Sequence, residues 1–372
     1  MLYIHVPFCQ SRCIYCDFYS TVAGDSMRKR YVASLVEELQ NRRDYLPSST
    51  LWTVYLGGGT PSMLSDEELD RVMECVRDCY ELHPGAELTF EANPDDITPA
   101  KVDHLRQLGF NRISLGVQSF NDGLLRLLNR RHTAAEAIRA VETIVSRGID
   151  NVSIDLMYGL PQQTEEMFEH DLRQALALPV KHLSSYALTV EEGTALCTLI
   201  RRGELRTADE EAYRREYERL MDLTGEAGFE HYEISNFALP GFYSRHNSAY
   251  WDGTPYLGCG PGAHSFNGTE RRFNLPDLKR YAEQPGNPPN EVETLTKAER
   301  FDELLFTSLR TRQGLSLGKV ENGFGKGWLR QLIDESRPFR ERGLMKMENG
   351  CLALTRQGIF VSDSLISDLM RG

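Results

Sequence analysis

Short apolar runs alternate along the first 230 residues with longer stretches in which apolar positions recur every three or four residues. The apolar runs predict buried strands near 2–8, 51–57, 87–92, 112–118, 151–157 and 182–188. The stretches of helical period predict helices near 26–46, 66–82, 99–108, 133–147, 164–177 and 209–227. Because strands that alternate with helices form a parallel sheet, the pattern predicts six β/α units.

Residues that cap helices stand at the expected boundaries. Ser65 with Glu68 and Thr133 with Glu136 have the spacing of a capping box. Glycines follow three of the helices, as expected of helix C-terminal stops, at Gly109, Gly148 and Gly228. Six units rather than eight favour an α/β fold class with an open, partial (β/α)6 barrel, although a doubly wound sheet shares this pattern of elements.

The alternation of strand and helix patterns ends near residue 230. This change, together with the return of helical patterns further on, divides the chain into three predicted regions. Residues 1–230 form the predicted barrel. Residues 231–295 are rich in aromatic residues, glycine and proline, and we interpret them as a wrapping or linker segment. Residues 296–372 return to helical patterns and carry the hairpin signal Asn349-Gly350, which predicts a small C-terminal α+β domain of winged-helix type.

Polar and glycine-rich residues follow the predicted strands. A parallel α/β architecture places its site at the carboxyl ends of its strands, so these residues are expected to gather on one rim. They are Gly58, Gly59 and Thr60 after the second strand, Glu91 after the third, Gln118 after the fourth, Asp155 at the fifth and Ala187 after the sixth. With Arg130, this set of carboxylate, amide and guanidinium groups suits a zwitterionic ligand that bears a ribose.

Three cysteines, Cys9, Cys13 and Cys16, stand at the spacing C-x3-C-x2-C directly after the first predicted strand. Thiolates bind iron–sulfur clusters, zinc or Cu(I), and structural zinc and fully ligated clusters usually take four protein ligands. A [4Fe–4S] cluster on three cysteines leaves one iron free for another ligand, which is the interpretation we favour. A structural zinc site completed by His5 or Asp17, and three core thiols without a metal, stay open as alternatives.

Composition narrows the classes of function. The 372-residue chain has a formal net charge of −12, which argues against broad binding to nucleic acid or anionic lipid. Its apolar runs are too short for a membrane span, and its first residues lack the pattern of an export signal. Because the cysteines form no disulfide framework, we expect a cytoplasmic protein.

Four motifs taken together resemble a known family. They are Tyr3-x-His5-x-Pro7-Phe8-Cys9 with the two further cysteines, Gly57-Gly58-Gly59-Thr60-Pro61-Ser62, Gly116-Val117-Gln118-Ser119-Phe120, and Asp155-Leu156-Met157-Tyr158-Gly159-Leu160-Pro161. The chain is similar along nearly its whole length to the radical S-adenosylmethionine (SAM) proteins of the HemN/HemW group, which includes the oxygen-independent coproporphyrinogen III dehydrogenase. The resemblance implies a radical-SAM barrel, a [4Fe–4S] cluster held by the three cysteines, and S-adenosyl-L-methionine on the free iron.

The resemblance also implies which residues contact S-adenosylmethionine. Tyr3 and Tyr15 would flank the cofactor and the cluster, and Ala187 would lie beside the adenine. The glycine turn would contact the methionine end, and polar side chains would complete the site, which gives Gly58, Gly59, Thr60, Glu91, Gln118, Arg130 and Asp155. No catalytic residue is assigned.

Two departures from the dehydrogenase pattern bear on function. Phe18 stands where that pattern has a fourth cysteine, and the chain begins two residues before Tyr3, without the dehydrogenase's N-terminal extension. Both features favour the haem-chaperone branch of the group, whose members bind haem b and deliver it to recipient haemoproteins such as respiratory cytochromes, some of them at a membrane. The alternatives are the dehydrogenase reaction itself, a radical decarboxylation of coproporphyrinogen III, and a zinc-stabilised binding module.

The segment from His246 to Trp251 matches the H-N-x-x-Y-W motif of the haem-chaperone branch. An imidazole can ligate haem iron, and Tyr and Trp offer flat apolar faces to a porphyrin. The motif residues expected to bind haem are His246, Asn247, Tyr250 and Trp251. His264 and Cys259 are alternative ligands to the iron.

Overall fold

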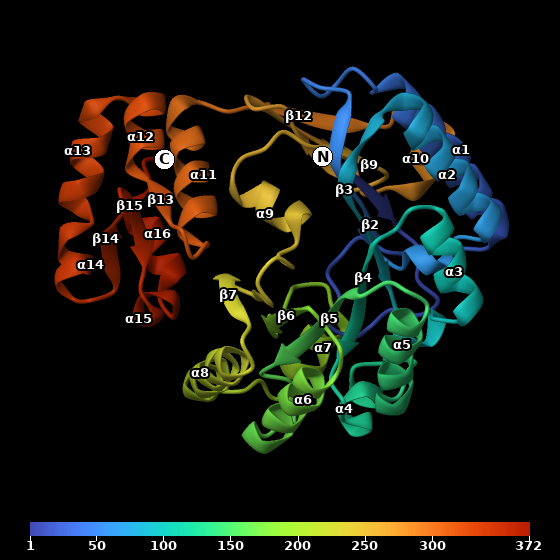
Figure 1. Cartoon of the computed structure of the whole chain (residues 1–372), viewed down its shortest axis with the longest axis horizontal. Coiled ribbons are helices and arrows are strands. Elements are labelled where there is room, and N and C mark those ends of the chain that lie inside the picture. Colours follow the sequence, from blue (N-terminus) through green and yellow to red (C-terminus); the bar gives the residue numbers. More distant parts are fainter.

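The computed structural model describes all 372 residues, and one large, mainly parallel sheet organises most of them (Figure 1). Six parallel strands lie side by side in chain order: β1 (Leu2–Val6), β2 (Thr50–Gly58), β3 (Glu81–Ala92), β4 (Arg112–Gln118), β5 (Asn151–Tyr158) and β6 (His182–Ala187). They coincide with the six predicted strands, and the prediction of a barrel of six β/α units is confirmed.

One long helix follows each parallel strand and lies on the outside of the sheet (Figure 1). These helices are α1 (Asp25–Asn41), α2 (Asp66–Cys79), α3 (Pro99–Gln107), α5 (Ala134–Ser146), α6 (Glu165–Ala177) and α8 (Glu210–Glu226), with two short additions, α4 (Asp122–Leu127) and α7 (Ala195–Arg201). Both predicted capping boxes form, at Ser65 with Glu68 and at Thr133 with Glu136. Local capping chemistry therefore fixes where these two helices begin.

The barrel is open. The short strand β9 (Leu257–Cys259) adds in parallel to β1 at one edge, while β8 (Asn236–Ala238) and then β7 (Glu230–Glu233) add in antiparallel fashion beyond β6. The end strands β7 and β9 do not pair with each other. Because the order from β1 to β6 follows the chain without a reversal, the sheet has no switch point of the doubly wound kind.

Alternation along the strands separates apolar from polar side chains. On β2, Val54 and Leu56 are fully buried in the apolar core shared with the helices, whereas Thr53 and Tyr55 contact polar groups inside the barrel. On β3, Glu91 likewise belongs to the interior. A barrel with polar residues along its inner surface can receive a polar ligand at the strand ends.

The segment from 231 to 295 is more ordered than its loosened sequence pattern indicates. It contributes β7 to β9, the helices α9 (Arg245–Trp251) and α10 (Leu278–Glu283), and a separate antiparallel sheet of β10 (His264–Phe266), β11 (Glu270–Asn274) and β12 (Asn290–Thr294). These elements are three to seven residues long, too short for a hydrophobic period to identify. In Figure 1, α9 lies between the large sheet and the C-terminal helices.

The C-terminal region has its own apolar core of 11 buried residues. Its elements are α11 (Lys297–Leu309), β13 (Leu315–Ser316), α12 (Leu317–Phe324), α13 (Lys326–Glu335), α14 (Arg337–Glu341), β14 (Met345–Glu348), β15 (Cys351–Leu354), α15 (Arg356–Ile359) and α16 (Ser362–Leu369). Asn349 and Gly350 have the positive φ values of a tight hairpin turn between β14 and β15, as the Asn-Gly signal predicts. This small α+β domain agrees with the predicted fold class.

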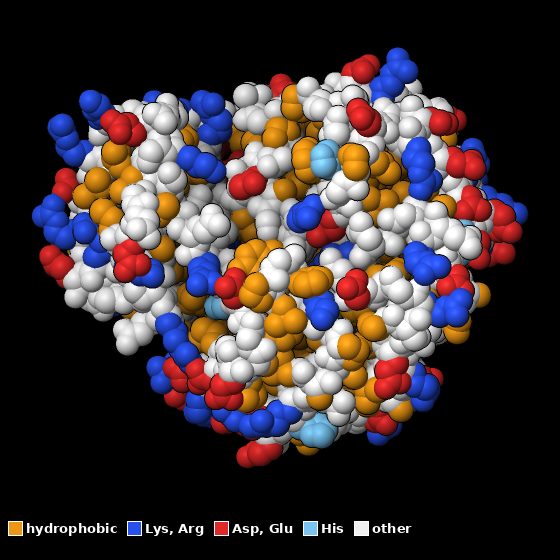
Figure 2. Space-filling view, in the orientation of Figure 1, with side chains coloured by type: hydrophobic (Ala, Val, Ile, Leu, Met, Phe, Trp, Pro, Cys, Tyr) orange, Lys and Arg blue, Asp and Glu red, His pale blue; other side chains and the backbone are white.

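The surface agrees with the composition. Figure 2 shows acidic and basic side chains interspersed over the visible face, with no extended basic patch. None of the helices has both the length and the apolar character needed to cross a membrane.

Candidate functional site

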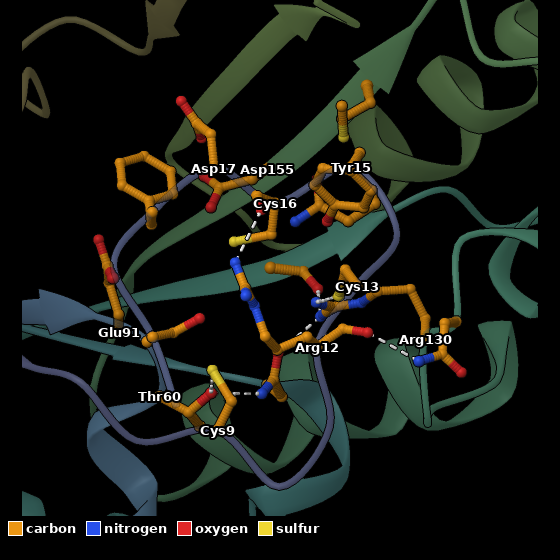
Figure 3. A pocket seen from close by; sticks show the side chains of 18 of the residues that line it. Cys9, Arg12, Cys13, Tyr15, Cys16, Asp17, Thr60, Glu91, Arg130 and Asp155 are labelled. Carbon is orange, nitrogen blue, oxygen red and sulfur yellow. Dashed lines mark hydrogen bonds between the residues drawn. The ribbon is translucent and has the colours of Figure 1, made fainter. Parts of the chain in front are cut away.

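A cavity of about 450 Å³ lies at the carboxyl ends of the parallel strands (Figure 3). Its size is typical of small-molecule sites. Twelve of the residues singled out from the sequence line it together: Cys9, Cys13, Tyr15, Cys16, Gly58, Gly59, Thr60, Glu91, Gln118, Arg130, Asp155 and Ala187. The structure thus brings the predicted rim residues and the three cysteines into one site.

The three cysteines lie on the loop between β1 and α1, which is tied to the rest of the barrel by backbone hydrogen bonds such as Ile14 N to Leu128 O at 3.2 Å. Thr60 Oγ1 donates to Cys9 Sγ at 3.6 Å, and Arg130 Nη1 donates to Cys13 Sγ at 3.3 Å. Both donors lie within hydrogen-bond distance of a cysteine sulfur. These donors suit a cluster held by sulfur.

The zinc alternative has less support from the geometry. No three His, Cys, Asp or Glu side chains converge as the ligands of a single ion would. His5 is buried, and its ring nitrogens hydrogen-bond with the Tyr3 hydroxyl and the Tyr19 carbonyl at 3.0 and 2.8 Å. Since each cysteine of a cubane binds a different iron, a cluster does not require the three sulfurs to converge on one point.

The glycine turn after β2 forms the wall of the cavity beside Cys9. Gly58 has a φ of 110°, and a Cβ there would lie 2.6 Å from the His5 ring. A Cβ on Gly59 would lie 2.7 Å from the carbonyl oxygen of Phe8. Only glycine fits at these two positions, because a side chain there would collide with the β1 strand and the residues that follow it.

Two half-buried carboxylates, Glu91 beside the glycine turn and Asp155 on β5, also line the cavity. Glu91 accepts hydrogen bonds from the Tyr55 hydroxyl at 2.5 Å and from Gly58 N at 3.0 Å, and Asp155 accepts one from Ser114 Oγ at 3.4 Å. Burial raises the pKa of Glu91 to about 7 and that of Asp155 to about 6. Such carboxylates are poised to ionise when a cationic ligand enters.

Gln118 and Arg130 complete the rim. Gln118 has a φ of 69° at a bulge between β4 and β5, a strained conformation that turns its side chain out of the strand register. Arg130 Nη2 donates to Asn93 Oδ1 at 2.6 Å and to the Gly116 carbonyl, which holds the guanidinium beside Cys13. The bulge therefore orients the side chain of Gln118. The contacts with Asn93, the Gly116 carbonyl and Cys13 orient that of Arg130.

Tyr3 is placed differently from the expectation. It does not line the cavity with Tyr15; instead its ring lies 6.0 Å from that of Tyr55, and its hydroxyl hydrogen-bonds with His5. The reason is register, because Tyr3 pairs with Tyr55 and both lie below the glycine turn. Tyr55, which sequence reasoning missed, holds Glu91; its inward position in the alternation of β2 was the available signal.

The H-N-x-x-Y-W motif forms α9, away from the cavity. His246 is 1% exposed, and its Nδ1 and Nε2 lie 2.7 Å from Thr53 Oγ1 and 3.1 Å from the Tyr250 hydroxyl. The amide groups of Arg245 and His246 donate to the Glu87 carboxylate at 3.0 and 3.1 Å. Both ring nitrogens are thus in use, and iron ligation would require the ring to leave this position.

We predict that His246→Ala lowers the free energy of unfolding by about 2–4 kcal/mol, because it removes two buried hydrogen bonds and leaves a cavity. Urea denaturation measures the change. Asn247→Ala is the matched control, since its half-buried side chain makes no hydrogen bond, and it should cost less than about 1 kcal/mol. Equal stability of His246→Ala and the unaltered protein would contradict the anchoring role.

Comparisons with known proteins agree with this architecture. Residues 3–175 match the Radical SAM superfamily, and residues 295–361 match the HemN C-terminal domain. A solved structure entitled "Coproporphyrinogen III oxidase (HemN) from Escherichia coli is a Radical SAM enzyme" superposes with a TM-score of 0.85 over 99% of this chain and 89% of that chain, at 24% identity, which shows a shared fold.

Curated relatives share more of the sequence. A protein of Lactococcus lactis named Heme chaperone HemW is 38% identical over 87% of this chain and 84% of its own length. A protein of the same name from Bacillus subtilis is 34% identical over 96% of this chain and 95% of its own length. The chain therefore belongs to the HemW family of radical S-adenosylmethionine proteins.

Proposed function

We propose that the protein is a haem chaperone, which binds haem b and delivers it to haem-requiring proteins, membrane-bound respiratory enzymes among them. The observation that carries the proposal is the alignment, over nearly their full length, with relatives named as haem chaperones. Membership in a family does not by itself fix a function, so the site must also be compatible with it.

The donor set of the cavity fits the groups that the superfamily implies. Cys9, Cys13 and Cys16 would hold a [4Fe–4S] cluster. The turn at Gly58 and Gly59 would receive the methionine end of S-adenosylmethionine, and the carboxylates and Gln118 would bind its ribose and balance its sulfonium charge. When bound, the cluster and cofactor supply one-electron chemistry, while the chain positions them and excludes water.

Phe18 favours the chaperone over the dehydrogenase. It occupies the position of the fourth cysteine of the dehydrogenase pattern and lies at the cavity with 63% of its side chain exposed. An exposed phenylalanine at the mouth of a site is suited to an apolar partner or ligand. The shared fold with HemN, at 24% identity, carries no information on chemistry.

A transfer assay tests the proposal. The protein with reconstituted cluster is loaded with haem and mixed anaerobically with a haem-depleted b-type respiratory enzyme, with haem-loaded serum albumin as the control donor. We expect the recipient to regain its haem spectrum faster from this protein than from albumin. Formation of protoporphyrinogen from coproporphyrinogen III, with dithionite and S-adenosylmethionine and without haem transfer, would favour the dehydrogenase instead.

A further inference from the structure

The nine histidines of the chain differ in whether a ring nitrogen is free to bind iron. A haem ligand needs an imidazole nitrogen with an accessible lone pair. Six histidines use their rings in contacts within the fold: His5, His104, His132, His182, His231 and His246. Three remain as candidates.

Of these three, His264 has the surroundings of a haem ligand. His83 accepts a hydrogen bond on Nδ1 from Gly85 N at 3.0 Å, so its other nitrogen carries the proton and has no lone pair for iron. His170 is exposed on α6, and no aromatic ring packs against it. His264 is exposed, makes no side-chain hydrogen bond, and stacks on Phe273 with 5.3 Å between ring centroids and 21° between planes.

His264 belongs to an aromatic face of the small antiparallel sheet. It lies directly opposite Phe273, and Phe266 lies opposite Arg271, so these four residues share one side of β10 and β11. The rings continue towards α9, with 6.3 Å between the centroids of Phe266 and Tyr256 and 4.7 Å between those of Tyr256 and Tyr250 of the H-N-x-x-Y-W motif. We call the set His264, Phe266, Arg271, Phe273 and Tyr256 the β10–β11 face.

Arg271 adds a positive charge to this face. Its Nη2 pairs with Glu303 of α11, whereas its Nη1 makes no hydrogen bond and is not buried, so one donor nitrogen is left over. Haem carries two propionates, and a guanidinium binds carboxylates well. On the neighbouring strand β12, Glu291 and Glu293 are exposed opposite Phe273 and Arg271 and limit the apolar area on that side.

We propose that His264 ligates the iron of haem, with the porphyrin lying on the β10–β11 face and a propionate at Arg271. This inference rests on the proposed function and names the iron ligand within it. Cys259, the other alternative ligand, is fully buried and cannot reach a surface-bound porphyrin. The H-N-x-x-Y-W motif then acts through Tyr250, at the end of the aromatic row, and by fixing α9 to the barrel.

Haem titration of the full-length protein with reconstituted cluster tests the assignment. His264→Ala is expected to weaken haem binding roughly tenfold or more and to abolish the absorption and resonance Raman signature of an iron–imidazole bond. Added imidazole should restore that signature, because the surface for the porphyrin is retained. His170→Ala, the matched control on an exposed helix, should leave both affinity and spectrum unchanged.

The possible outcomes separate this inference from the proposed function. Unchanged affinity and ligation in His264→Ala would overturn the inference while the chaperone proposal stands. A folded His246→Ala variant that loses the iron–imidazole signature, with His264→Ala unaffected, would assign the bond to His246 and also overturn it. Absence of haem binding by the unaltered protein would remove the proposed function and this inference together.

Discussion

Cys13→Ser is expected to leave the protein without an iron–sulfur cluster after anaerobic reconstitution. A serine hydroxyl is a hard, protonated donor and replaces a thiolate poorly in a soft metal site. Arg130, which donates to Cys13 Sγ, would lose its sulfur acceptor as well. Because only three cysteines line the cavity, no neighbouring cysteine can compensate. Iron and acid-labile sulfide analysis, with the absorption band of the cluster, measures the loss.

Cys351→Ser is the matched control for this loss. Cys351 is also a half-buried free cysteine, but it lies on β15 of the C-terminal domain, remote in the fold from the cavity. It should retain the full iron content of the unaltered protein. Equal iron in Cys13→Ser and Cys351→Ser would contradict the assigned ligands, and zinc without iron in the unaltered protein would reinstate the structural zinc alternative.

The rim of the barrel could be predicted from sequence because topology determines it. Once the apolar runs are assigned to parallel strands, the residues after each run must gather at one edge of the sheet. Glu91, Gln118 and Asp155 are separated by 27 or more positions in the sequence, yet they line one cavity. The capping boxes were predictable for a different reason, since their partners are only three residues apart.

The role of His246 could not be predicted because its partners are distant in the chain. Its Nδ1 bonds with Thr53, 193 residues away, and its helix is held at the N-terminus by Glu87, 159 residues from His246. A local motif gives no information on such contacts, and a histidine beside two aromatic residues fits both a ligand and an anchor. Only the folded structure shows that the ring is engaged on both sides.

The placement of Tyr3 illustrates a second limit. Even when the residues of a strand are predicted correctly, the height of each inward side chain along the barrel is not known. That height depends on the register with the neighbouring strand. Tyr3 pairs with Tyr55, which puts it below the glycine turn and behind the residue that holds Glu91. The strands β10, which bears His264, and β11 could not be predicted because they are too short to show a hydrophobic period.

Binding of S-adenosylmethionine is expected to weaken as the pH falls from 8 to 6. The sulfonium group of the cofactor carries a permanent positive charge, which favours ionised Glu91 and Asp155. Their pKa values are raised by burial to about 7 and about 6, so by pH 6 Glu91 is mostly protonated and Asp155 is about half protonated. Each proton that must be released reduces affinity, and together they reduce it about ten- to twentyfold.

Isothermal titration of the cluster-containing protein at several pH values measures this slope, and Glu91→Gln isolates its main source. The amide keeps the shape of the side chain and can still accept from Gly58 N, but it does not titrate. Affinity of Glu91→Gln should therefore be lower at pH 8 and should vary only about twofold down to pH 6, the part that Asp155 contributes.

Glu216→Gln distinguishes titration inside the cavity from titration elsewhere. Burial also raises the pKa of Glu216 to about 7, and Glu216 also accepts a backbone hydrogen bond, from Gly159 N at 2.9 Å, but it lies outside the cavity. Removing its charge should leave the pH dependence of cofactor binding intact. If Glu216→Gln flattened the slope as Glu91→Gln does, the dependence would not arise from the carboxylates that line the cavity. A slope removed only by Glu91→Gln would instead identify the carboxylate beside the glycine turn as the group that must lose its proton before the cationic cofactor binds.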